Sequence, residues 1–190
     1  MTRKRSMAAS ASLLDDVHTQ KVLEIWEALE ANVGVKGVAI SPLPHFSYMA
    51  ARDFDLDVLQ EVVGEVASKA RPLMVRTAGV GIFTGEKPVV YLPIVRSPEL
   101  AKLQLALWSA GALAAEKPLA EYHPAAWIPH VTLAQGDVTH DNVLDVLGIL
   151  NKMVLDWEFE VDNLSIVRGR GAEPQKLLAR YDLGGTARRF

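Results

Sequence analysis

The 190-residue sequence contains no cysteine, which excludes disulfide bonds and thiolate metal ligands. It has no apolar run near the roughly 20 residues that a membrane-spanning helix needs. Basic residues are not in excess, because 20 Lys and Arg stand against 23 Asp and Glu and the formal net charge is −3. A protein that coats extended nucleic acid needs a basic surface. These counts therefore argue against a long duplex as the partner, but they allow a small anionic ligand at a local site.

The size and composition predict one globular domain. A hydrophobic content of 49% with 23% charged residues is ordinary for such a domain. The first residues are basic and then small, a pattern too weak for a signal peptide. We therefore expect a disordered tail over residues 1–14 and a single domain over residues 15–190. The lack of cysteine is compatible with a reducing compartment, and we expect a cytoplasmic monomer.

One short stretch occurs twice. Residues 43–48 read Leu-Pro-His-Phe-Ser-Tyr, and residues 128–133 read Ile-Pro-His-Val-Thr-Leu. Alternate side chains of a β-strand point to opposite faces. His45 and Ser47 should therefore share one face, as should His130 and Thr132. Each copy would present an imidazole beside a hydroxyl, with the intervening residues packed underneath.

Such pairs suit reactions at phosphate. An imidazole with its ordinary pKa of about 6.5 transfers protons near neutral pH. A hydroxyl donor stabilises negative charge on a nonbridging oxygen. A lone histidine in an apolar strand is more often a satisfied core residue, but two matching copies among five histidines favour the functional interpretation. His18, His123 and His140 lack ligand-type spacing, so no metal site is predicted, and His18 and His140 are expected at the surface.

The rest of the chain predicts an α+β fold with an internal repeat. Helix starts are indicated by capping side chains, namely Asp15 or Asp16, Asp53 or Asp55, Ser97, and Thr139. Besides the motif strands, strands are expected at residues 35–41, 73–83, 89–95, 157–168 and 175–183. The order of elements before residue 95 recurs from residue 97, so the duplicated halves span about 15–95 and 97–183. We expect two pseudo-symmetric lobes of antiparallel sheet with outer helices and a groove between them.

The paired motifs resemble the signatures of the 2H phosphoesterase superfamily. Within that superfamily, they are most similar to those of the bacterial 2′-5′ RNA ligase-like proteins. Residues 127–133 match the second motif of that branch, and Ser47 stands where Thr is commoner in the first. The resemblance extends over about residues 15–183. It implies the bilobal fold, with the two motifs meeting in the groove.

The resemblance implies a metal-independent phosphodiesterase without a cofactor. His45 and His130 would be the acid and base, and Ser47 and Thr132 the phosphate-binding donors. The substrate would carry a 2′,3′-cyclic phosphate or a 2′-5′ linkage, in a small nucleotide or at an RNA terminus. The sequence has no Gly-rich loop ending in Gly-Lys-Ser/Thr, so ligation would have to be the reverse of cleavage.

Two further residues are weaker candidates for the site, and two alternative functions remain open. The 85-residue offset between the motifs also relates Phe83 to Arg168, which we consider as a base platform and a phosphate contact. Their alternative interpretation is a core aromatic and a solvated arginine. The alternative functions are a non-catalytic module that binds nucleotides or RNA ends, and an interaction protein in which the repeated motif is coincidental.

Overall fold

The computed structural model describes residues 5–36, 43–170, 173–185 and 187–189. Its four α-helices are α1 (Asp16–Val33), α2 (Leu56–Lys69), α3 (Pro98–Gly111) and α4 (Val143–Leu150), and a 3-10 helix, η2, covers Ala120–Tyr122. The strands in the first half of the chain are β1 (Arg5–Leu13), β2 (His45–Asp55), β3 (Leu73–Arg76), β4 (Gly81–Phe83) and β5 (Val89–Pro93). Those in the second half are β6 (Ala115–Pro118), β7 (His130–Ala134), β8 (Glu158–Val161), β9 (Asn163–Arg170), β10 (Glu173–Asp182) and β11 (Ala187–Arg189). No described helix is long and apolar enough to cross a membrane.

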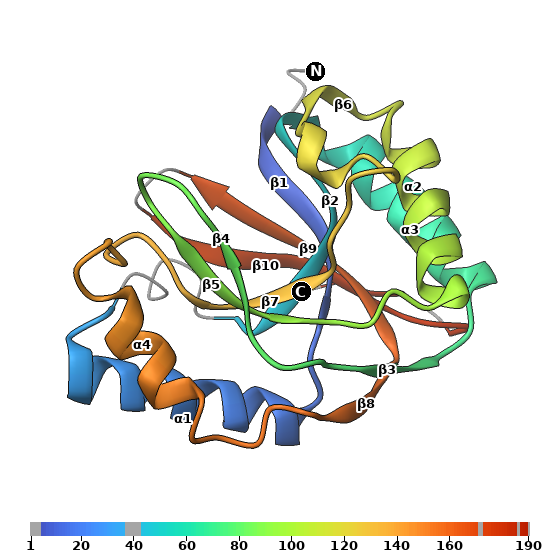
Figure 1. Cartoon of the computed structure of the whole chain (residues 1–190). Helices are drawn as coiled ribbons and strands as arrows, with labels where there is room; N and C mark the ends of the chain where they lie inside the picture. Colours follow the sequence, from blue (N-terminus) through green and yellow to red (C-terminus); the bar gives the residue numbers. More distant parts are fainter. Residues whose placement is uncertain (1–4, 37–42, 171–172, 186, 190) are drawn as a thin grey trace.

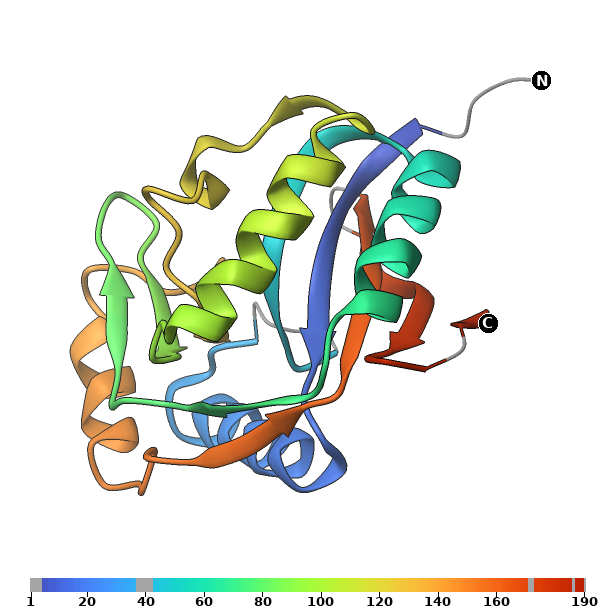
Figure 2. The same ribbon diagram turned by 90° about the vertical axis from the view of Figure 1, so that its right-hand side faces the viewer.

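The chain forms two lobes of antiparallel sheet, as expected. The first lobe is a six-stranded sheet in the order β11-β10-β9-β1-β2-β6, and helices α2 and α3 pack beside each other against it (Figure 2). The second lobe holds the three-stranded sheet β4-β5-β7 and the strand pair β3-β8, which an isolated bridge between Thr77 and Ile94 connects. Helices α1 and α4 lie together on the outer side of this lobe (Figure 1).

The two halves of the repeat do not coincide with the two lobes. Helix α1, from the first half, contacts α4 and the second motif strand β7. Helix α3, from the second half, contacts α2 and the first motif strand β2. The first helix of each half therefore packs in the lobe that holds the motif strand of the other half. This exchange buries the apolar face of each helix against the sheet of the opposite motif, which sequence order alone does not reveal.

The prediction of a disordered tail is wrong for residues 5–13, which form β1 in the middle of the large sheet. β1 pairs with β2 on one side and with β9 on the other. Ala11 lies opposite both Ser47 and Ser165 and is completely buried. The stretch Ser-Met-Ala-Ala-Ser-Ala-Ser has low intrinsic β propensity. Pairing on both sides outweighs that local preference, and its small side chains fit between the covering layers.

Most helix boundaries follow the predicted caps. The side chains of Asp15, Asp55 and Ser97 accept hydrogen bonds from backbone N–H groups at the starts of α1, α2 and α3. The prediction for α4 is wrong, because Asn142 and not Thr139 precedes its first helical residue. Most of the strand predicted at residues 35–41 lies outside the described residues.

Two predicted strands are interrupted where the chain passes between sheets. The segment 73–83 divides into β3 and β4, with Gly79 between them at a φ of +66°. The segment 157–168 divides at Asp162 into β8, which pairs with β3, and β9, which pairs with β1. Both interruptions place one continuous apolar stretch in two different sheets.

Candidate active site

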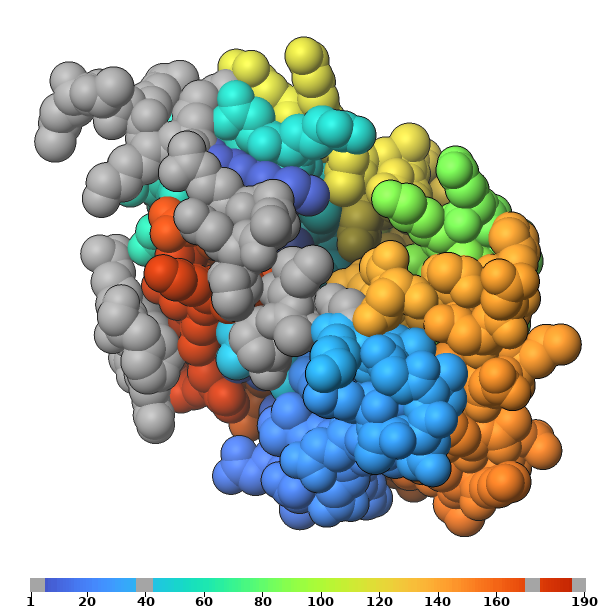
Figure 3. Space-filling view, turned by 90° about the vertical axis from the view of Figure 1, so that its left-hand side faces the viewer, coloured from blue at the N-terminus to red at the C-terminus, as the bar shows by residue number. Residues whose placement is uncertain are grey.

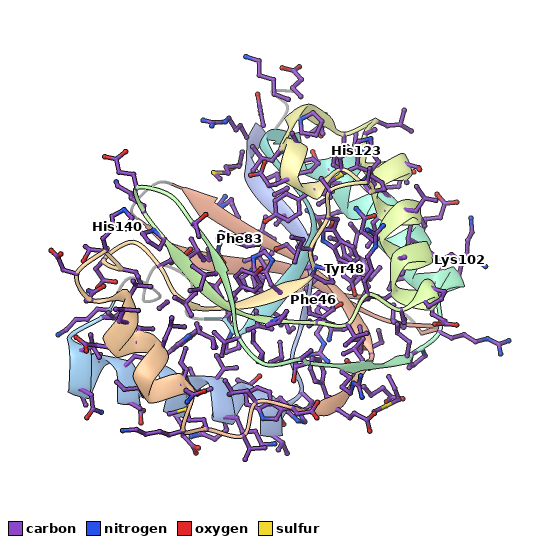
Figure 4. The ribbon with its side chains drawn as sticks, in the orientation of Figure 1. Phe46, Tyr48, Phe83, Lys102, His123 and His140 are labelled. Atoms are coloured by element: carbon purple, nitrogen blue, oxygen red, sulfur yellow. The ribbon has the colours of Figure 1, made fainter. Side chains whose placement is uncertain are left out.

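The motif strands have the predicted alternation. His45 and Ser47 at the start of β2 are partly exposed, whereas Phe46 and Tyr48 between and beyond them are buried. Strand β7 repeats this pattern, with His130 and Thr132 partly exposed and Val131 buried. Figure 4 places Phe46 and Tyr48 near the centre of the molecule, to the left of α3. The polar side chains of each motif therefore point to one common face.

The structure brings both motifs together. His45, Ser47, His130 and Thr132 all line one cleft of about 360 Å³. Its walls come from both lobes, because β2 belongs to the six-stranded sheet and β7 to the three-stranded sheet. The space-filling view shows the surface hollowed between the blue residues of β1 and the green β4–β5 turn (Figure 3).

Both imidazoles are anchored in the same way. His45 Nδ1 lies 2.6 Å from the carbonyl oxygen of Leu43, and His130 Nδ1 lies 2.7 Å from that of Ile128. A carbonyl oxygen only accepts hydrogen bonds, so each Nδ1 carries a hydrogen and donates it. In the neutral state the lone pair is therefore on Nε2, which is the atom available for proton transfer.

The surroundings of both imidazoles favour their neutral forms. Burial lowers the pKa of His45, the Leu43 carbonyl partly opposes this shift, and repulsion from protonated His130 lowers the pKa further. Burial also lowers the pKa of His130, and the hydrogen bond with the Ile128 carbonyl partly opposes this shift. An anion between the two rings would act in the opposite direction, because it stabilises the protonated forms.

Two tryptophans hold the motif backbones. Trp127 Nε1 donates to the carbonyl oxygen of Ser47 over 2.8 Å, and Trp26 Nε1 donates to that of Thr132 over 3.3 Å. Trp127 is buried, and Trp26 comes from α1 of the exchanged helix pair. The hydroxyl residue of each motif is therefore tied to a distant part of the chain. The sequence pattern gave no indication that Trp26 would form this hydrogen bond with the second motif.

Phe83 lies in the cleft wall beside the second histidine. Its ring stacks on Tyr91 with centroids 4.1 Å apart and meets His130 edge-on at 5.0 Å. Gly81 allows this packing, since a Cβ there would lie 2.4 Å from the Tyr91 ring. Phe83 also lines an adjoining apolar pocket of about 270 Å³. Figure 4 shows its side chain near the centre of the molecule, between the lobes.

Arg168 does not join this site. Its neighbours Val167 and Gly169 line the cleft, but Arg168 is not among the lining residues. Strand alternation places its side chain on the other face of β9. The structure therefore gives no support to the predicted phosphate contact of Arg168.

Sequence reasoning missed Tyr122 and Glu121, which line both the cleft and the adjoining pocket. They come from η2, which has no periodic pattern that would have indicated a site. Burial raises the pKa of Tyr122, the Glu121 carboxylate raises it further, and a side-chain hydrogen bond with Ser47 partly opposes both effects.

The remaining histidines lie outside the cleft. His18 is buried, contrary to expectation. It pairs with the Asp15 carboxylate at 2.8 Å and packs on Trp157 and Phe159. His123 and His140 are exposed and lie at the periphery in Figure 4. Within the described parts of the chain, no three His, Cys, Asp or Glu side chains are grouped so that they could hold a metal ion.

Comparison with known proteins agrees with this architecture. Residues 17–173 match the family model of the 2′-5′ RNA ligase superfamily. A Bacillus thuringiensis (strain Al Hakam) protein named "Putative phosphoesterase" is 30% identical over 129 residues, which cover 65% of this chain and 69% of the relative. A protein of the same name from Bacillus cereus (strain Q1) matches with the same identity and coverage.

Solved structures show the same fold at low sequence identity. TT0787 of Thermus thermophilus matches with a TM-score of 0.67 and 18% identity, covering 94% of this chain and 98% of the other. E. coli LigT complexed with 3′-AMP matches with a TM-score of 0.60 and 17% identity, covering 95% and 99%. With the family match over most of its length and both histidine motifs in one cleft, the chain belongs to the 2′-5′ RNA ligase superfamily of 2H phosphoesterases.

Proposed function

We propose that this protein hydrolyses a 2′,3′-cyclic phosphate or a 2′-5′ phosphodiester in a small nucleotide or at an RNA end, by acid–base catalysis with two histidines. One observation carries the proposal. Two imidazoles, each held through Nδ1 by a backbone carbonyl, line the same cleft as two hydroxyl groups. A non-catalytic binding module would have no need for two proton carriers in matched tautomers.

The chemistry follows from these groups. One neutral histidine takes a proton from water through Nε2 while the water oxygen attacks phosphorus. The bond from phosphorus to one ribose oxygen breaks, and that oxygen takes a proton from the other, protonated histidine. Ser47 and Thr132 can donate hydrogen bonds to the nonbridging oxygens as charge develops there. A 5′-hydroxyl in place of water would give ligation, so no ATP and no metal ion is required.

Phe83 supplies a surface for a nucleobase. Base–aromatic stacking contributes about 1–3 kcal/mol and tolerates different bases. The apolar pocket beside Phe83 is also lined by Trp127 and Ile128, so a base there would be adjacent to a phosphate held by His130. The LigT complex with 3′-AMP supports a ligand of this size.

The direct test is turnover by the purified, EDTA-treated protein. We would incubate it with each of the four 2′,3′-cyclic nucleotides and with a 2′-5′-linked dinucleotide, and follow the products by ³¹P NMR. The proposal expects a phosphomonoester from at least one substrate, with EDTA having no effect. Saturable binding without turnover would instead support the binding module. If the protein neither bound nor cleaved any of these substrates, both functions would be contradicted.

The pH dependence of kcat/KM should be bell-shaped, with its maximum below pH 6.5. Activity requires one neutral and one protonated histidine, and kcat/KM reports the free enzyme. Burial lowers both pKa values. The acid limb of the profile, where the base becomes protonated, therefore moves to lower pH. The alkaline limb, where the acid loses its proton, moves in the same direction. The rate should fall about tenfold per pH unit beyond each limb.

The corresponding profile of kcat should lie at higher pH, since the bound phosphate stabilises the imidazolium form. Measurement of both profiles between about pH 4.5 and 9 on one cyclic nucleotide separates the two effects. A maximum of kcat/KM well above neutrality, or a plateau on the alkaline side, would show that the two-histidine scheme is wrong.

A further inference from the structure

One carboxylate lies in the wall of the pocket that adjoins the cleft of the two motifs. Glu121 in η2 lines both the cleft and the apolar pocket of about 270 Å³, as do Phe83 and His130. A carboxylate beside a phosphate site repels the charge of the ligand, so it lowers affinity unless the ligand donates hydrogen bonds to it. The position of Glu121 therefore points to a ligand that carries such donors.

Two tertiary contacts fix η2 beside the first motif strand. Gln104 on α3 is completely buried, and its Nε2 donates to the carbonyl oxygens of Tyr122 at 2.8 Å and of Tyr48 at 3.2 Å. The backbone N–H of Leu119, directly before η2, donates to the carbonyl oxygen of Ala50 at 2.9 Å. The backbone of η2 is therefore held against β2, and the fold itself determines the position of this wall.

Many N–H groups of the wall are already engaged inside the protein. Four backbone N–H groups donate to carbonyl oxygens within residues 119–123, namely those of Tyr122, His123, Ala126 and Trp127. The ring N–H groups of Trp127 and His130 likewise donate to backbone carbonyl oxygens. Of the described residues that line the pocket, Glu121 is the one whose side chain only accepts hydrogen bonds. The wall thus presents a pair of acceptor oxygens to a ligand, while these donors are occupied.

Nucleobases differ in how many donors they place side by side. Guanine has its N1–H next to its N2 amino group, and two parallel donors match the two oxygens of one carboxylate. Adenine and cytosine each place one amino group beside an acceptor nitrogen, and uracil places one N–H between two carbonyl groups. A pair of acceptor oxygens therefore favours guanine, because the acceptors of the other three bases would be repelled.

We propose that Glu121 is a specificity-determining residue that makes guanine the preferred base of the substrate. A guanine stacked on Phe83 lies in the pocket that Glu121 also lines, and its N1–H and N2 amino group donate to the carboxylate oxygens. The phosphate of the same nucleotide then reaches His130, which borders both the pocket and the cleft. This inference rests on the proposed function, which leaves the base open.

Two purine substrates that differ by one amino group test this role. Guanosine and inosine 2′,3′-cyclic phosphates share a ring system, but inosine lacks the N2 amino group. The wild type should have a kcat/KM about tenfold higher for the guanosine substrate, at the low end for a hydrogen bond to a charged group because Glu121 is exposed. In Glu121→Gln the ratio should fall below about twofold, since the one amide oxygen accepts from the N1–H that both bases carry.

The matched control is Glu86→Gln. Glu86 is exposed in the turn between β4 and β5 and is not among the residues that line the cleft or the pocket. This variant removes the same charge, so its general effect on an anionic substrate should be equal for both bases, and the tenfold ratio should remain. A ratio near one in the wild type, or an unchanged ratio in Glu121→Gln, would overturn the inference.

Binding of nucleoside 3′-monophosphates separates this inference from the proposed function. The dissociation constants of the guanosine and inosine compounds, measured by calorimetry, should show the same tenfold ratio and its loss in Glu121→Gln. If the wild type cleaved neither cyclic nucleotide but kept this ratio in binding, the proposed function would fail and the role of Glu121 would stand. Equal kcat/KM values for the two substrates would retain the proposed function and remove the role of Glu121.

Discussion

Replacing either cleft histidine by alanine is expected to slow turnover of a 2′,3′-cyclic nucleotide by about 10²–10⁴-fold, the usual contribution of one general acid or base. Each of His45 and His130 has its Nδ1 bound to a carbonyl oxygen, so each variant removes one oriented Nε2 from the cleft. Single-turnover kinetics at the optimal pH would measure the loss separately from binding and product release.

The double variant, with both histidines replaced, should lose much less than the product of the two single losses, because residues that act as a unit are not additive. His140→Ala is the matched control, since that histidine is exposed and lies outside the cleft. The thermal unfolding of all variants should remain close to that of the wild type. If either single variant kept wild-type turnover, the acid–base pair would have to be abandoned.

Deleting residues 1–12 is expected to abolish cooperative folding. This deletion removes nearly all of β1, which pairs with β2 and β9 and separates them in the six-stranded sheet. Both neighbours would lose their ladder partners, and unpaired backbone groups in a buried region are costly. The near-ultraviolet circular dichroism and the urea unfolding curve would report the loss of a packed core.

A pair of substitutions provides a finer test. Ala11→Asp places a carboxyl group at a completely buried position of β1, and the effective cost of an unpaired buried charge is several kcal/mol. Ala106→Asp introduces the same side chain at an exposed position of α3 and should lower the free energy of unfolding by less than about 1 kcal/mol. Similar unfolding free energies for the two variants, or a folded deletion variant, would support the tail that the sequence suggested.

Local patterns in the sequence were sufficient to predict which side chains of the two motifs share a face. Strand alternation predicted that His45 shares a face with Ser47, and His130 with Thr132, and the burial pattern of both strands agrees. The capping side chains Asp15 and Ser97 marked the starts of their helices. These features were readable because each depends on residues one to four positions apart, where strand parity and helix-end hydrogen bonding act directly.

Only the tertiary structure decided which distant segments meet. It placed the weakly β-prone residues 5–13 in the centre of a sheet and packed α1 and α3 against the motif strands of the opposite halves. It also buried His18 in contact with the rings of Trp157 and Phe159. It also brought Tyr122 into the cleft that Ser47 lines, and Arg168 is not among the residues that line that cleft. These outcomes depend on contacts between residues far apart in the chain. There, the burial of apolar surface and the pairing of backbone groups outweigh the local preferences that a sequence pattern records.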